Sequence, residues 1–193
     1  HKKLKKDFKA LQAENFNNNF LISENKIFKS KIEDIVDSSS EILAKVLVDK
    51  QSPFLKSVIV NRGSKDGVKL GMAVLDGEFL IGKIVEVNFR TARVLLLSDL
   101  NSKVPVSVEP SSMQSILSGT GEKFGKLQYT QRDNFTLSNG NQIYSSGSGG
   151  IFKSGIPIGK INFIDDSNES YVLFHSDFTQ LRLVKIVLYE NLN

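Results

Sequence analysis

The distribution of glycine and proline constrains this chain more than any other feature of its sequence. All 14 glycines and all 4 prolines lie at or after Pro53, so the first 52 residues contain neither residue type. Glycine and proline interrupt helices and mark the turns between short strands. The sequence therefore predicts a long N-terminal helix followed by a turn-rich β region.

A narrow apolar stripe runs along this expected helix, from residue 2 to about residue 36. Its members lie on one helix face, with a break at the asparagine-rich segment 14–20: Leu4, Phe8, Leu11, Leu21, Phe28 and Ile32. A narrow stripe is typical of coiled coils. We expect the helix to pair with a second copy through these residues, and packing onto the β region is the alternative.

Twelve short runs of β-branched and apolar residues follow, separated by turn residues. Strands at this spacing are typical of small barrels or sandwiches. A polar break at residues 109–115 divides the runs into two sets of six. The predicted fold is mainly β, with a coiled-coil helix over residues 1–38, a first β-barrel over 39–109 and a second over 110–193. The C-terminal strand is free to pack on the first barrel.

The composition excludes several kinds of site. The chain has no cysteine, which rules out disulfides, thiolate zinc sites and a cysteine nucleophile. Its two histidines, His1 and His175, are far apart, so we predict no metal and no cofactor. Five lysines lie in the first nine residues. They indicate either a solvated helix end or a binder of nucleic acid or another anionic polymer, and we predict no nucleic-acid partner because basic and aromatic residues do not alternate along the strands.

The segment SSGSGG, residues 145–150, is the strongest hint of an enzyme. Ser146 or Ser148 could act as a nucleophile with His175 and Asp177, or with Lys153 as the base. The spacing of these residues does not bring them together, and it does not fit a phosphate-binding loop either. A serine hydrolase is therefore the alternative to a non-enzymatic protein.

The order of several motifs resembles the rod shape-determining protein MreC family of bacteria over most of residues 44–164. The motifs are NRGSKDGVKLGMAV (61–74), VLLLSD (94–99), ILSGTG (116–121) and NGNQIYSSGSGGIFKSGIPIG (139–159). The resemblance implies barrels similar to chymotrypsin-like folds, although a shared fold does not transfer catalysis. The glycines of the last motif then act as turn devices: Gly140, Gly147, Gly150, Gly155 and Gly159.

The resemblance also implies a function. The chain would belong to a non-enzymatic periplasmic scaffold of the cell-elongation machinery, which controls bacterial cell shape. It would form dimers or filaments and bind peptidoglycan synthases, notably the elongation-specific penicillin-binding protein, together with other membrane shape proteins. A membrane helix upstream of His1 would anchor it in the inner membrane. The alternative is a periplasmic serine hydrolase that uses Ser146 or Ser148.

Phenylalanine supplies the candidates for partner binding. The chain has 13 phenylalanines and no tryptophan, and we expect Phe124, Phe135 and Phe152 to lie in turn segments. Turns usually lie on the surface, and exposed aromatic side chains often anchor interfaces. The alternative is that each ring folds back and caps a barrel end.

Overall fold

A computed structural model describes residues 18, 22, 41–47, 56–128, 137–163 and 170–188. The chain divides into two units, His1–Ser39 and Ser40–Asn193. In the first unit the described residues are Asn18 and Ile22, which are both helical and exposed. The six residues of the predicted coiled-coil stripe lie outside the described residues, so helix pairing stays a prediction. No helix in the described part has the length and apolar composition that crossing a bilayer requires.

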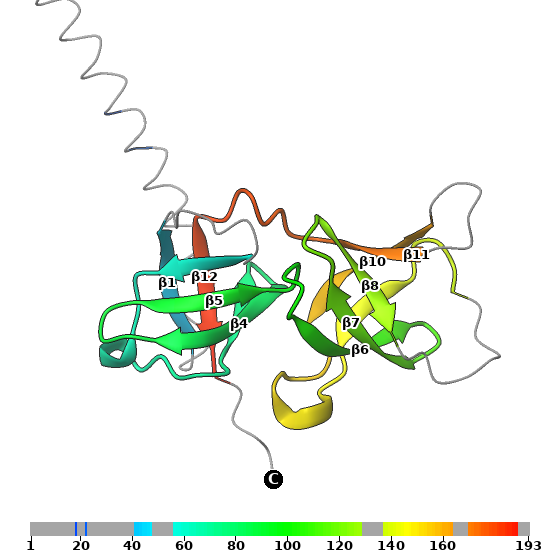
Figure 1. The fold of residues 1–193 in the computed structure, drawn as a ribbon, viewed down its shortest axis with the longest axis horizontal. Helices are drawn as coiled ribbons and strands as arrows, with labels where there is room; N and C mark the ends of the chain where they lie inside the picture. The colour runs from blue at the N-terminus through cyan, green and yellow to red at the C-terminus, as the bar shows by residue number, and fades with distance from the viewer. Residues whose placement is uncertain are drawn as a thin grey trace, which may run out of the picture. The chain divides into compact units, whose positions relative to one another are not determined.

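The second unit contains two closed barrels of six strands each, and every pair of neighbouring strands is antiparallel (Figure 1). The first barrel consists, in order, of β1 (Glu41–Leu47), β12 (Leu183–Val187), β3 (Ala73–Asp76), β4 (Phe79–Val87), β5 (Ala92–Leu96) and β2 (Ser57–Val60). The second consists of β10 (Pro157–Phe163), β11 (Ser170–Phe174), β8 (Phe124–Gln128), β7 (Met113–Gly119), β6 (Lys103–Glu109) and β9 (Gln142–Ser145). Short 3-10 turns lie at Ser64–Asp66 (η1) and Ser148–Gly150 (η2).

The strands follow the pattern of the sequence, and each of the twelve predicted runs overlaps one strand. In β5, Ala92, Val94 and Leu96 are buried, while the residues between them are half-exposed. Successive side chains of a strand point to opposite faces, so the apolar set fills the barrel. Fully burying one such valine or leucine contributes about 1.5–3 kcal/mol relative to leaving it exposed.

The strand order departs from the predicted division of the chain at β6 and runs across it at β12. The C-terminal strand β12 (red in Figure 1) pairs with β1 and β3 and closes the first barrel. Strand β6 pairs with β7 and β9 and belongs to the second barrel. The boundary expected after residue 109 is therefore wrong. The residues that follow β6 form the tight connection to β7 rather than a linker between barrels.

The contact between the barrels joins two of the motifs. Asp99 is fully buried, and its carboxylate accepts the backbone N–H groups of Lys56 and Asn101, both at 2.7 Å. A Cβ atom on Gly119 would lie 2.0 Å from the Asp99 carbonyl oxygen, so only glycine fits there. Apolar side chains of the first barrel, including Leu75 and Leu80, share one buried cluster with the core of the second.

Candidate partner-binding surface

The glycine-rich segment forms a fixed loop between β9 and β10. The buried Ser145 hydroxyl donates to the carbonyl oxygen of Lys153 at 2.5 Å and accepts the N–H of Ile156 at 3.0 Å. Gly147 and Gly150 have φ values of 75° and 66°, which are strained for other residues. The Ser146 hydroxyl accepts the Ser148 N–H at 3.2 Å. These serines therefore hold the backbone of the loop.

His175 and Asp177, the predicted base and orienting group of a Ser-His-Asp site, are hydrogen-bonded elsewhere. Nε2 of His175 lies 3.0 Å from Oε1 of Gln142, and the His175 ring centroid lies 5.0 Å from that of Phe79. Desolvation, together with the charge of Lys160, lowers the pKa of His175. The Asp177 carboxylate accepts the hydroxyl and N–H of Thr179, and these hydrogen bonds lower its pKa. The geometry thus gives no support to a Ser-His-Asp arrangement.

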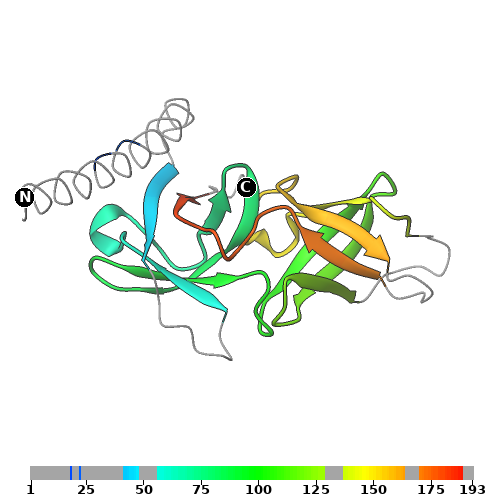
Figure 2. The same ribbon diagram turned by 90° about the horizontal axis from the view of Figure 1, so that it is seen from above.

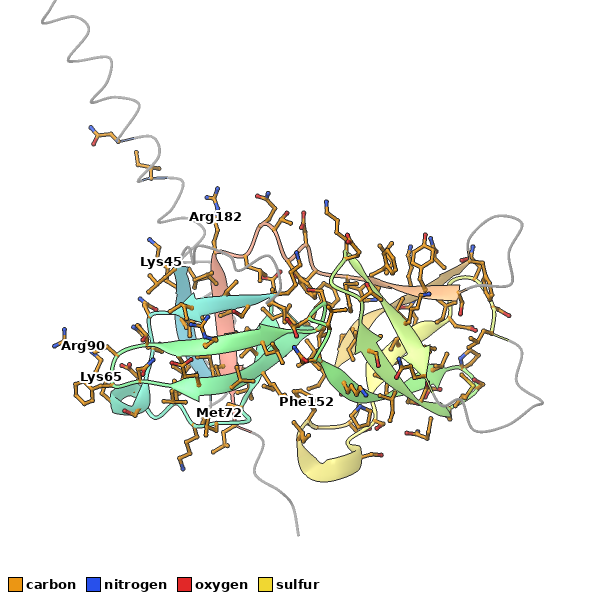
Figure 3. All side chains as sticks on the ribbon, viewed as in Figure 1. Lys45, Lys65, Met72, Arg90, Phe152 and Arg182 are labelled. Carbon is orange, nitrogen blue, oxygen red and sulfur yellow. The ribbon has the colours of Figure 1, made fainter. Side chains whose placement is uncertain are left out.

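The three predicted phenylalanine anchors have different positions. Phe152, labelled in Figure 3, is 6% exposed and belongs to the buried apolar cluster that contains side chains of both barrels, so the expectation that it is an exposed anchor is wrong. The segment that follows the glycine loop therefore buries this ring rather than exposing it. Phe135 lies outside the described residues. Phe124 begins strand β8 rather than lying in a turn, and it is half-buried.

Phe124 belongs to an apolar group on the outer face of β8 and β11, which we call the aromatic patch: Phe124, Tyr171 and Leu173. Phe124 and Leu173 lie directly opposite each other in the antiparallel pair, and the ring centroids of Phe124 and Tyr171 are 5.4 Å apart. Leu173 is 38% exposed. Figure 2 shows β10 and β11 side by side on this side of the barrel.

A cavity of about 360 Å³, the junction cavity, adjoins the patch at the contact between the barrels. Its apolar walls are Leu96 of the first barrel, Leu173 of the second, and Phe178 of the connection from β11 to β12. Lys56 and Lys123 also line it. An apolar centre with charged groups nearby is the usual composition of a protein–protein interface. The patch and the cavity together can receive apolar side chains of a partner.

Comparison with known proteins identifies the family. A family model described as "Rod shape-determining protein MreC, barrel core" matches residues 46–188. The chain belongs to the MreC family. The cell shape-determining protein MreC of Cereibacter sphaeroides is 36% identical over 116 residues, which cover 60% of this chain and 38% of that protein. The crystal structure of MreC from Pseudomonas aeruginosa has 31% identity and a TM-score of 0.70, covering 78% of this chain and 100% of the other.

Two more distant MreC structures share the fold alone. One is the MreC of a complex with penicillin-binding protein PBP2 from Helicobacter pylori, at 14% identity, a TM-score of 0.56, and coverage of 77% of this chain and 99% of that one. The other is the major periplasmic domain from the cell shape-determining filament MreC, at 20% identity, a TM-score of 0.67, and coverage of 78% and 98%. The chain matches 37% to 64% of the length of the curated MreC relatives. MreC proteins are shape-determining structural proteins and not enzymes, in agreement with the prediction for this chain.

Sequence reasoning missed two residues of the aromatic patch in this MreC barrel core. Val172 and Phe174 point into the barrel, and Tyr171 and Leu173 point outward. The sequence feature that could have indicated these two residues is the uninterrupted apolar run at residues 171–174. An antiparallel strand with one solvated face alternates apolar and polar residues, and apolar residues at both kinds of position depart from this pattern.

Proposed function

We propose that this chain is part of a non-enzymatic periplasmic scaffold of the cell-elongation machinery, and that its aromatic patch binds the elongation-specific penicillin-binding protein. The observation that carries the proposal is the apolar outer face of β8 and β11, where Leu173 is 38% exposed beside Phe124 and Tyr171. A solvated barrel strand has no need of apolar residues on that face. A partner protein that covers these residues would explain why they are apolar.

The relatives support this assignment. One solved structure is a complex between penicillin-binding protein PBP2 and MreC from Helicobacter pylori, and another is the major periplasmic domain from the cell shape-determining filament MreC. We extend both properties to this chain. Self-association into dimers or filaments would use the N-terminal stripe from Leu4 to Ile32, and an inner-membrane anchor would precede His1. Other peptidoglycan synthases and membrane shape proteins would join the same assembly.

Self-association can be tested separately from partner binding. The full chain should sediment as a dimer or larger species, and a shortened chain that begins at Ser39 should sediment as a monomer. Pairing would be weak, because the asparagine-rich segment 14–20 places polar residues in the middle of the seam. Equal self-association of the two chains would show that the helix is not the contact.

The proposal predicts a specific effect of removing the patch. Truncating a side chain at the centre of an interface lowers the binding free energy by more than about 1 kcal/mol. A loss of about 1.4 kcal/mol corresponds to a tenfold increase in Kd. We expect Leu173→Ser to weaken binding to the purified penicillin-binding protein about tenfold. Its melting temperature should hardly change, because the Leu173 side chain lies on the outer face of β11.

The matched control is an exposed apolar residue of the other barrel. Phe89 is 67% exposed and lies in the connection between β4 and β5. Phe89→Ser should leave the affinity unchanged. The proposal is wrong if Leu173→Ser binds with full affinity, or if Phe89→Ser weakens binding as much as Leu173→Ser does.

A further inference from the structure

A second cavity, of about 430 Å³, lies on the second barrel and is distinct from the junction cavity. Strands β6, β7 and β9 form its floor, and the glycine loop bounds it. Gln114, Ser107 and Tyr144 lie directly opposite one another on these three strands. Opposite residues in neighbouring strands share one face of the sheet, so the three side chains form a row across the floor.

Nearly every residue that lines this cavity can form hydrogen bonds. The Glu109 carboxylate accepts the hydroxyls of Ser107 at 2.8 Å and of Ser112 at 3.1 Å, which fix its position. Within the described part of the chain, the side chains of Gln114, Tyr144 and Ser154 make no hydrogen bond. They offer an amide and two hydroxyls, which both donate and accept.

Hydrogen bonds within the protein hold the rim of the cavity in place. Ser145 holds the glycine loop through its side chain, and its carbonyl oxygen also accepts the N–H of Gly155 at 2.8 Å. Gly155 has a φ of 89°, which turns the chain sharply beside Ser154. A rim that is already ordered reduces the entropy cost of binding. The loop that resembles a nucleophile turn thus forms one wall of this cavity.

The chemistry of the lining selects a class of ligand. The described residues that line the cavity include one carboxylate and no lysine or arginine, which disfavours anions. Both sheets are closed, so a peptide finds no free strand edge of a barrel to pair with. Hydroxyl, amide and carboxylate groups around one aromatic ring suit a ligand that carries many hydroxyls.

We propose that this cavity binds a neutral oligosaccharide strand without cleaving it. Sugar hydroxyls would exchange hydrogen bonds with Gln114, Tyr144 and Ser154, and the Glu109 carboxylate would accept from a further hydroxyl. Glycoside hydrolysis generally uses a pair of carboxyl groups, and among the described lining residues Glu109 supplies one. This property goes beyond the proposed scaffold function and involves a different surface from the aromatic patch.

The test is a titration of the ¹⁵N-labelled full chain followed by NMR. The probes are chitotetraose, with β-linked acetylated sugars, and maltotetraose, with α-linked unacetylated ones, each up to about 10 mM so that a Kd of about 1 mM is detectable. We expect at least one of them to shift the backbone amides of Gln114, Tyr144 and Ser154. Losing one hydrogen bond should weaken binding about three- to tenfold, so Gln114→Ala should raise the Kd by that factor.

The matched control is Gln180→Ala, which removes the same kind of group from an exposed position outside both cavities. It should leave the Kd for the sugar unchanged. The proposal is overturned if neither sugar shifts these amides, or if the shifts spread equally over the whole surface. Gln114→Ala should also keep full affinity for the penicillin-binding protein, so failure here is distinguishable from failure of the scaffold proposal.

Discussion

Replacement of Lys185 by methionine should destabilise the first barrel. Lys185 lies in β12, the strand that closes this barrel, and is only 5% exposed. Its ammonium group lies 3.6 Å from Oε2 of Glu41 and 3.3 Å from Oε1 of Glu78. The Glu41 oxygen is buried and has no hydrogen bond among the described residues. Lys185→Met would leave this carboxylate without its cation.

The two ion pairs should differ in their contribution to stability. At 3.6 Å and an effective dielectric constant of about 20, the Coulomb attraction between Lys185 and Glu41 is about 4–5 kcal/mol. Breaking a buried pair from one side costs about 3–5 kcal/mol. The Glu41 side chain keeps 18% exposure, so we expect about 3 kcal/mol, or a fall in Tm of about 6–12 °C. The Glu78 side chain is 80% exposed, and its pair should contribute less than about 1 kcal/mol.

Urea and thermal unfolding of four proteins measure these contributions: the wild type, Lys185→Met, Glu78→Gln, and the double variant Lys185→Met with Glu41→Met. The double variant should return to within about 1–2 kcal/mol of the wild type, because apolar residues can replace a buried pair at little cost. The reasoning is refuted if Lys185→Met is as stable as Glu78→Gln, or if the double variant is no more stable than Lys185→Met.

Three further predictions concern the second barrel. Ser146→Ala and Ser148→Ala should both restore rod shape in a strain depleted of its own MreC, and loss of shape with a normally folded Ser146→Ala protein would revive the hydrolase hypothesis. Gly147→Val should lower the free energy of unfolding by about 1–3 kcal/mol, because φ is 75° at that residue and a β-branched side chain is strained there; an unchanged urea midpoint would contradict this. Since the pKa of His175 is lowered below its usual 6.5, the unfolded chain binds the proton more tightly, so stability should fall as the pH drops through about 6.5 and level off below the folded-state pKa. His175→Gln should reduce this pH dependence, and an identical pH profile would contradict the assignment.

The strands could be predicted from the sequence because their signals are local. Runs such as β5, with Ala92 and Val94 inside, are bounded by turn residues and need no knowledge of their partners. The choice of partner is not local. The polar residues after Glu109 look like a linker, yet they connect β6 to β7 within one barrel. Strand β6 also pairs with β9, and this second pairing shows that β6 belongs to the second barrel.

The candidate site could be predicted only in part, because exposure depends on how a loop folds. Phe152 follows a segment with three glycines in four residues and looks like a surface residue, but its side chain is buried. Phe124 was predicted to bind a partner because it was expected in a turn, but it begins strand β8. Tyr171 and Leu173 were missed because an apolar run also fits a strand buried on both faces. Only the position of β11 in the barrel distinguishes these cases.

The central claim is that the outer face of β8 and β11 holds the penicillin-binding protein. A photo-crosslinking amino acid placed at residue 173 of the full-length protein in living cells tests it most directly, with the same amino acid at residue 89 as the control. The account predicts a crosslinked product that contains the penicillin-binding protein from position 173 and none from position 89. A crosslink from position 89 and none from 173 would contradict it.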